Sequence, residues 1–304
     1  MCNFSIGTKQ ESMTQRGPNR DRTGQLFVVA TPIGNLEDIT LRALRVLKGC
    51  DLIACEDTRQ TAKLLNHFGI EKRMLSYHEH NEMTRAAELA IELERGTHIA
   101  LVSDAGMPGI SDPGHRLINL CIRHGFTVTP IPGANAMVAA LAVCGLPIEH
   151  FTFAGFLPPR PTERRKALRQ LAAETGTLAL YEAPHRLLDT LEDSLEILGN
   201  RPAVIAREMT KVHEEFLRGH LDELVAAIQK KEIRGEVTLL IGPVDETKRI
   251  EGQPGEAAQP LAKRVEEIMA EKGLDQKAAL KQAARERGIT RREAYKELLI
   301  TRED

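Results

Sequence analysis

The feature that most constrains the fold is a Gly/Pro-rich loop over residues 102–114, with the sequence VSDAGMPGISDPG. A short apolar run over residues 98–102 predicts a buried strand before the loop, and apolar residues between positions 117 and 122 predict a helix after it. In open α/β sheets, the loops that follow the strands form the crevice where ligands bind. This stretch therefore predicts an α/β fold with a ligand site at the loop.

The polar side chains of this loop are those of Ser103, Asp104, Ser111 and Asp112, and the loop contains no Lys or Arg. A loop that cradles a polyphosphate usually carries a cation. Two carboxylates favour a cationic or zwitterionic ligand instead. The alternative interpretation is a long structural turn that binds nothing.

Two further predicted strands end in loops of the same kind. Residues 26–30 run into TPIGNLED, and residues 127–130 run into IPGANA. The first of these loops has a single glycine and no lysine, which excludes a dinucleotide-binding fingerprint and a P-loop. A third strand, over residues 51–54, precedes CEDTR, where Asp57 either serves function or caps the next helix. The repeated strand, loop and helix predict a largely parallel sheet.

Charged clusters also follow strands in the second half of the chain. The strands predicted there are residues 151–156, 177–181, 203–206 and 237–241. Because charges are costly to bury unpaired, we expect these clusters to line a cleft or to pair with one another. The predicted organisation is a disordered tail (1–24), a first α/β domain (25–146), a second α/β domain (147–243), a linker (244–259) and a helical domain (260–304).

The predicted helical domain carries an apolar face and several capping signals. Leu261, Val265, Ile268 and Met269 share one face, and Asp275 is an expected N-cap. The sequence TRRE at residues 290–293 fits a capping box. Basic residues around a turn near Gly288 are similar to those of a helix-turn-helix; they are Arg285, Arg287, Arg291 and Arg292. Acidic residues nearly balance them, so a packing or docking domain is as good an interpretation as a nucleic-acid reader.

Composition narrows the function classes. The net charge of −2 means that any nucleic-acid binding depends on local patches. Aromatic residues make up 4% of the chain and Trp is absent, which argues against RNA modules that stack bases on aromatic platforms. The five cysteines show no CxxC spacing, which is typical of a reducing compartment and indicates a cytoplasmic protein. No stretch has the length of a membrane span.

No metal site is predicted. His78 and His80 lie two residues apart, but no third ligand is near them in the sequence. A solvated turn is the simpler interpretation of this pair.

With these motifs collected, the chain resembles the tetrapyrrole-methylase superfamily, the class III S-adenosylmethionine methyltransferases, over residues 26–243 and a C-terminal helical domain. Within it, the chain is most similar to the branch that methylates small-subunit ribosomal RNA. The motifs that carry the resemblance are ATPIGNL (30–36), CEDTR (55–59), residues 103–114, IPGAN (131–135), YEAPHR (181–186) and residues 206–214. Porphyrin-precursor methylases have Gly-Pro-Gly-Asp after the first strand and a Gly-Gly-Asp-Pro loop. This chain has TPIG and SDAG at these places, which weakens the interpretation that its substrate is a tetrapyrrole.

The resemblance implies two α/β domains of the tetrapyrrole-methylase type, with S-adenosylmethionine in the cleft between them and a homodimer as the working unit. It implies 2′-O-methylation of a cytidine ribose in the decoding region of 16S rRNA in the small ribosomal subunit. By motif correspondence, the expected cofactor contacts are Pro32, Ser103, Asp104, Gly106, Pro108, Ile110, Pro132, Gly133, Ala134, Asn135, Leu157, Tyr181, Glu236 and Val237. A methylase of a small tetrapyrrole-like acceptor and a non-catalytic ribosome-assembly factor are the alternative functions.

A general base assists methyl transfer to a hydroxyl, and charged residues after the predicted strands supply four candidates: Lys211, Glu208, His185 and Glu56. Lys211 would need a depressed pKa, from Arg207 or from desolvation. It could instead pair structurally with Glu208 or Glu214. The expected RNA contacts are Arg160, Arg164, Arg165, Lys166 and Arg186, although residues 160–169 could also form a solvated helix face.

Overall fold

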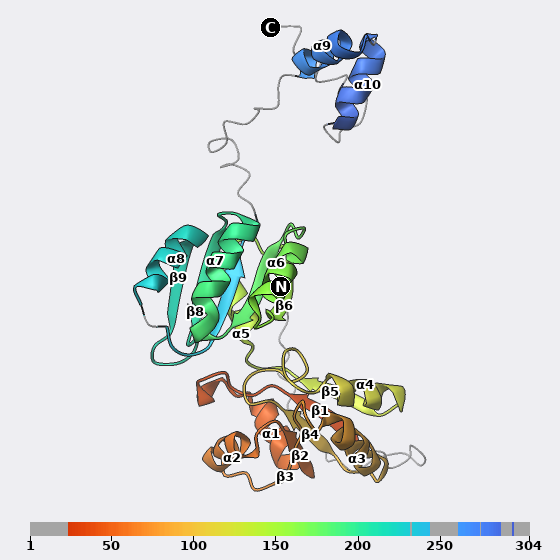
Figure 1. Ribbon diagram of the computed structural model, residues 1–304. Coiled ribbons are helices and arrows are strands. Elements are labelled where there is room, and N and C mark those ends of the chain that lie inside the picture. Colours follow the sequence, from red (N-terminus) through yellow and green to blue (C-terminus); the bar gives the residue numbers. More distant parts are fainter. Residues whose placement is uncertain (1–23, 232, 244–260, 274, 287–293, 295–304) are drawn as a thin grey trace, which may run out of the picture. The chain divides into compact units, whose positions relative to one another are not determined.

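A five-stranded parallel sheet forms the first half of the chain in the computed structural model (Figure 1). Its strands, in spatial order, are β3 (Arg73–Ser76), β2 (Leu52–Cys55), β4 (Ile99–Val102), β1 (Gln25–Val29) and β5 (Thr127–Ile131). All four residues of β2 and of β4 are buried, as expected for strands covered on both faces. The parallel sheet predicted for this half is confirmed.

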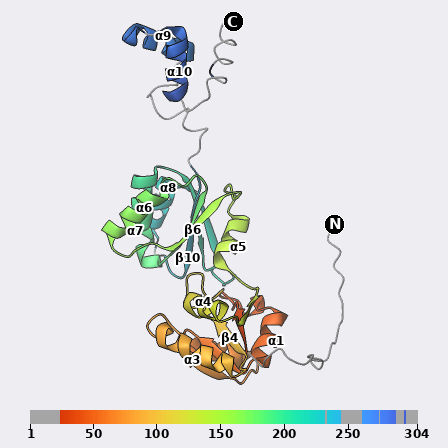
Figure 2. The ribbon, with the colours of Figure 1, turned by 90° about the vertical axis from the view of Figure 1, so that its right-hand side faces the viewer.

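Helices cover both faces of this first sheet. The apolar residues of α1 (Leu41–Gly49) and α2 (Thr58–His67) pack on one face. Those of α3 (Glu82–Glu94) and α4 (His115–Arg123) pack on the other. Figure 2 shows α1 and α3 on opposite sides of the sheet. Because every strand is parallel, the loops after β1, β2, β4 and β5 all emerge at one edge.

The second sheet is mixed. Its order is β6 (Phe151–Phe156), β7 (Thr177–Glu182), β10 (Val237–Ile241), β8 (Pro202–Arg207) and β9 (Glu215–His220). Only the β6–β7 pair is parallel. One face is covered by α6 (Pro161–Leu171), α7 (Leu187–Leu198) and α8 (Leu221–Gln229). Short 3-10 turns, η1 (Leu36–Asp38) and η2 (Pro184–Arg186), follow β1 and β7.

The other face of the second sheet is covered by α5 (Ala136–Val143), which precedes that sheet in the chain. Met137, Ala140 and Leu141 of α5 are buried against Ala179 of β7 and Leu240 of β10. Figure 2 shows α5 on the side of the sheet opposite α6 and α7. The packing of the second sheet therefore begins before position 146, where the change in composition suggested a boundary.

Two strands have no counterpart in the sequence prediction. β3 reads Arg-Met-Leu-Ser and has no fully buried residue. β9 reads Glu-Phe-Leu-Arg-Gly-His and is partly buried at most positions. Both lie at sheet edges, where one side is solvated and the apolar pattern is weak. Asp57 does cap α2, because its carboxylate accepts the Arg59 N–H at 2.8 Å.

The structure describes residues 24–231, 233–243, 261–273, 275–286 and 294. The chain divides into two units, Met1–Val244 and Asp245–Asp304. The predicted tail (1–24) and linker (244–259) lie almost wholly outside the described residues, as do Thr290–Glu293, Arg287 and Gly288. No helix in the described ranges has the length and apolar character needed to cross a bilayer.

The second unit contains α9 (Leu261–Lys272) and α10 (Gln276–Glu286). Val265 and Ile268 of α9 are buried against Ala283 of α10, and Met269 packs beside them. The predicted N-cap is confirmed, since the Asp275 carboxylate accepts the Ala278 N–H at 2.8 Å. The side chains of Leu261 and Arg285 are not described, and Arg291 and Arg292 lie outside the described residues.

Candidate functional site: an acidic cavity between the two sheets

A cavity of about 490 Å³ lies between the two sheets of the first unit. The loops that follow β2, β4 and β5 line it from the first sheet, together with Ile33 after β1. The second sheet contributes Phe156 and Tyr181, Met209 after β8, and residues 235–238 at the start of β10. The Gly/Pro loops singled out in the sequence thus converge on one site.

The loop over residues 103–114 is held in shape by contacts with Thr31. Thr31 and Gly106 exchange two backbone hydrogen bonds, of 2.9 and 3.1 Å, across the loops after β1 and β4. Gly106 has φ +80°, a conformation that favours glycine. Ser103 is buried, and its hydroxyl donates to the Gly106 carbonyl at 3.3 Å. The loop is therefore a fixed wall of the cavity.

Glu56, Asp104 and Asp112 form an acidic cluster in this cavity. Burial raises the pKa of Glu56, and the neighbouring charges of Asp112 and Asp104 raise it further. Burial likewise raises the pKa of Asp104 and of Asp112, although the Asp57 N–H and the Ser103 hydroxyl partly offset the effect. Within the described part of the chain, no ion pair involves these carboxylates, and no Lys or Arg lines the cavity. The cluster suits a ligand with cationic centres.

Seven of the expected cofactor residues line the cavity; they are Asp104, Gly106, Ile110, Asn135, Tyr181, Glu236 and Val237. The other seven are not among the lining residues; they are Pro32, Ser103, Pro108, Pro132, Gly133, Ala134 and Leu157. Ala134 packs with Ile33, and Leu157 is buried in the core of the second sheet.

Lys211 lies at the edge of the cavity with its ammonium paired. It contacts Glu208 at 2.9 Å and Glu236, a lining residue, at 3.2 Å. Partial burial would lower the pKa of Lys211, but the hydrogen bonds to the two carboxylates outweigh it, and the pKa is raised. Arg207 pairs with Glu215 instead. Lys211 therefore has the opposite of the depressed pKa that a general base needs.

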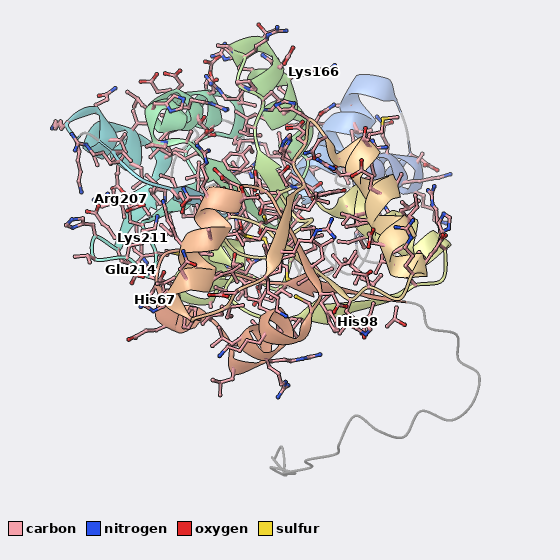
Figure 3. All side chains as sticks on the ribbon, turned by 90° about the horizontal axis from the view of Figure 1, so that it is seen from below. His67, His98, Lys166, Arg207, Lys211 and Glu214 are labelled. Carbon is pink, nitrogen blue, oxygen red and sulfur yellow. The ribbon has the colours of Figure 1, made fainter. Side chains whose placement is uncertain are left out.

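The segment that carries Lys211, which is labelled together with Arg207 and Glu214 in Figure 3, is tightly constrained. Glu208 and Thr210 have φ values of +51° and +67°, which are strained for residues other than glycine. Glu208 accepts the Glu236 N–H at 3.1 Å, and its carboxylate lies where a Cβ on Gly235 would be. Glu208 thus acts on the cavity through the backbone of residues 235 and 236.

Of the other two proposed bases, Glu56 lines the cavity and His185 does not. His185 is exposed on η2, although its neighbours Ala183 and Pro184 are lining residues. Among the four candidates, only the Glu56 carboxylate faces the cavity directly.

Arg164 does not fit its expected RNA contact. It is 3% exposed, and its guanidinium donates to Asp193 of α7 at 2.7 Å. Arg165 pairs with the same Asp193 carboxylate and with Glu196. The prediction that Arg164 contacts RNA is therefore not supported, because Arg164 forms an ion pair that joins α6 to α7.

The remaining basic candidates differ in exposure. Arg160, the N-cap residue of α6, is exposed and pairs with Glu163 at 3.4 Å. Lys166 is exposed on α6, and Figure 3 shows it well separated from Lys211. Arg186 is mostly buried; it pairs with Glu182 at 3.4 Å and donates to the carbonyls of Leu157 and Pro158. Arg186 therefore fastens the turn after β6.

Asp112 and Phe156 are among the lining residues that lie outside the predicted set. The acidic composition of the loop was a usable signal for Asp112. Nothing local marked Phe156, because its position depends on an irregularity in β6. Within the described ranges, no group of three or more His, Cys, Asp or Glu side chains could hold a metal ion.

Sequence relatives share most of the chain. A protein of Halalkalibacterium halodurans is 51% identical over 276 residues, covering 91% of this chain and 95% of its own length. A protein of Escherichia coli O157:H7 is 44% identical over 287 residues, covering 93% and 98%. Both relatives are named "Ribosomal RNA small subunit methyltransferase I".

Solved structures with the same fold are more distant in sequence. The methyltransferase CobJ has a TM-score of 0.56 at 22% identity and covers 73% of this chain and 95% of its own. A uroporphyrin-III C-methyl transferase from Thermus thermophilus, complexed with S-adenyl homocysteine, has a TM-score of 0.51 at 21% identity, with coverage of 75% and 100%. The family model for Tetrapyrrole (Corrin/Porphyrin) Methylases matches residues 25–225. The chain belongs to the tetrapyrrole methylase family.

Proposed function

We propose that this protein is an S-adenosylmethionine-dependent methyltransferase that 2′-O-methylates the ribose of a cytidine in the decoding region of 16S rRNA. The observation that carries the proposal is the acidic, cation-free cavity, found in a chain whose relatives of 44% and 51% identity are named small-subunit rRNA methyltransferases. The family is one of methylases, and a solved member holds S-adenyl homocysteine.

The residues of the cavity fit the proposed cofactor. S-adenosylmethionine supplies an activated methyl group on a cationic sulfonium, and it carries an α-ammonium as well. Asp104 and Asp112 would hold these cationic groups, and the Gly106 backbone allows close approach. Tyr181 and Ile110 would supply apolar contact area. A polyphosphate cofactor would meet carboxylates where it needs cations.

The protein's part in the reaction is to align the ribose hydroxyl and to accept its proton. Alignment can supply most of the rate, because the methyl group is already activated. Among the four proposed bases, Glu56 fits best, since its carboxylate faces the cavity and burial raises its pKa. Lys211 and Glu208 would instead position residues 235 and 236, which line the cavity.

The proposed RNA path runs over the exposed cations of α6. Arg160 and Lys166 can reach phosphates from there, and Arg165 is half-buried beside them. A target base with an exocyclic amine suits the cavity carboxylates, because Asp and Glu accept from cytosine N4. The homodimer and the cytoplasmic location that the sequence suggested stay predictions.

The test is transfer of labelled methyl groups to undermethylated small subunits, followed by mapping of the label by mass spectrometry. We expect the label on the 2′-oxygen of one cytidine in the decoding region. Label on a small tetrapyrrole-like acceptor, with none in 16S rRNA, would support the first alternative function. Cofactor binding with no transfer at all would support a non-catalytic assembly factor.

Cofactor affinity is expected to fall as the pH is lowered. Burial raises the folded-state pKa of Glu56, Asp104 and Asp112, so these groups lose their charge at a higher pH than in the unfolded chain. Once protonated, they attract a cation less. As the pH falls from about 7 toward the ordinary carboxyl pKa values of about 4, we expect the Kd for S-adenosylhomocysteine, which carries the α-ammonium, to rise, as measured by calorimetry.

The same pKa shifts predict that the stability of the ligand-free protein increases as the pH is lowered. A carboxyl whose pKa is raised on folding destabilises the folded state above that pKa, and the penalty is relieved as the pH falls toward the unfolded value.

The control for the affinity measurement is the Asp112→Asn variant, whose Kd for S-adenosylhomocysteine should depend less steeply on pH. A wild-type Kd that stays flat over this range would contradict the proposed role of the cluster.

A further inference from the structure

Phe156 is an exposed aromatic ring at the cavity. It is 57% exposed and lines the cavity, at the end of β6. Among the large apolar side chains that are exposed in the described ranges, only Phe156 and Ile110 line this site. Since exposing a ring forgoes the stabilisation of burial, this position needs an explanation beyond packing.

A bulge in β6 aims Phe156 at the cavity. The register between β6 and β7 shifts between Phe153 and Gly155, and Gly155 has φ +62°, a conformation that a residue with a side chain rarely adopts. A Cβ at Gly155 would lie 3.6 Å from the hydroxyl of Ser111, another lining residue. Bulges next to active sites commonly redirect a side chain in this way.

A neighbouring ring contacts Phe156, and hydrogen bonds fix the backbone that follows it. Its centroid lies 5.6 Å from the ring of Tyr181, at an interplanar angle of 57°, and the Tyr181 hydroxyl accepts the Met137 N–H at 3.3 Å. Directly after Phe156, Arg186 donates to the carbonyls of Leu157 and Pro158 at 2.8 and 3.2 Å. Phe156 is therefore a pre-positioned surface with one exposed side.

The charges near Phe156 favour a base inside the cavity and the phosphates of the same nucleotide near Arg160. The cavity has carboxylates and no Lys or Arg, which favours a neutral heterocycle over a phosphate. Arg160, four residues further along the chain, has a side chain that is 81% exposed. Four residues of chain span at most about 14 Å, which is within reach of the phosphates that flank one nucleotide.

We propose that Phe156 is the stacking platform for the base of the target nucleotide, which enters the cavity unstacked from its neighbours. Aromatic side chains bind unstacked bases in this way in single-stranded RNA recognition. The proposal rests on the proposed function. The adenine of the cofactor is also a heterocycle and could stack on the same ring. The exposure of the Phe156 ring and its nearness to Arg160 favour the substrate base.

The chain contains no tryptophan, so the Phe156→Trp variant has a single tryptophan, at the proposed platform, which can be excited selectively over the three tyrosines. The matched control is Phe151→Trp, at the other end of β6, where the side chain is 46% exposed and does not line the cavity. We expect a short single-stranded RNA of the decoding region to quench the fluorescence of the first variant and not of the second. Quenching by S-adenosylhomocysteine alone would overturn the assignment in favour of the adenine, and absence of quenching by either ligand would overturn it outright.

Kinetics give a second readout. For small-subunit methylation, Phe156→Ala should lower kcat/KM about tenfold or more, while the Kd for S-adenosylhomocysteine changes less than about twofold. Phe156→Tyr, which keeps the ring, should retain most of the activity. Equal losses in both measurements, or no loss in either, would contradict the proposal. If the wild-type protein labels no rRNA, the proposed function fails by itself, and the quenching experiment still decides what the ring binds.

Discussion

Replacing Asp104 with asparagine is expected to weaken binding of S-adenosylhomocysteine by about 10- to 100-fold, the equivalent of losing one charge-assisted hydrogen bond. One Asp104 oxygen accepts the Asp57 N–H at 3.1 Å, which anchors the carboxylate at the start of α2. Asparagine keeps an oxygen for that hydrogen bond, removes the charge and replaces the second carboxylate oxygen, an acceptor, with an NH2 donor. Isothermal calorimetry at neutral pH measures the effect.

The control for this substitution is Asp38→Asn. Asp38 is an exposed carboxylate on η1 that does not line the cavity, so its loss should leave the Kd within about twofold of the wild-type value. If Asp104→Asn binds as tightly as the wild-type protein, Asp104 does not hold the α-ammonium, the cationic group that S-adenosylhomocysteine shares with the cofactor. A parallel loss in both variants would indicate a general electrostatic effect.

Replacing Arg164 with alanine is expected to lower the free energy of unfolding by about 3 kcal/mol, because breaking a buried ion pair leaves its partner uncompensated. Arg164 lies 2.7 Å from Asp193, which is itself buried, and 3.9 Å from Asp189. Arg165 still contacts Asp193 in the variant, which keeps the expected loss at the lower end of the range for buried pairs. Urea denaturation measures the change through the shift of the midpoint.

Lys166→Ala is the matched control, two residues further along α6 and exposed. Its free energy of unfolding should change by less than about 0.5 kcal/mol. Its RNA affinity should fall, with a shallower dependence on salt, if α6 contacts phosphates. If the Arg164→Ala variant is as stable as the wild-type protein but binds RNA more weakly, Arg164 contacts RNA as the sequence predicted.

The sequence by itself determined four strands of the first sheet, all except the edge strand β3, and the loops that line the cavity. Parallel strands covered on both faces are continuous apolar runs, which residues 52–55 and 99–102 display without reference to any partner. The carboxyl ends of such strands meet at one edge, so the convergence of the loops follows from topology alone. The acidic character of the loop over residues 103–114 required only its composition.

Tertiary structure decided what each charged side chain does. Arg164 and Arg160 look alike in the sequence, yet Arg164 is buried against Asp193 of α7, 29 positions away, while Arg160 is exposed and pairs with Glu163, three positions away. The pKa of Lys211 is raised by the hydrogen bond to Glu208, three positions away, and also by Glu236, which is 25 positions away and lies 3.2 Å from the ammonium. Pairing across elements has no local signature, because it depends on how helices and strands pack.

Backbone irregularity was likewise decided only in three dimensions. The bulge that directs Phe156 toward the cavity comes from a mismatch between β6 and β7, and the packing of α5 on the second sheet comes from a face of small apolar residues that could have fitted either sheet. Local patterns specify which residues are buried within an element. The contacts between elements specify which side chains reach the cavity, because they set the register and the pairing of charges.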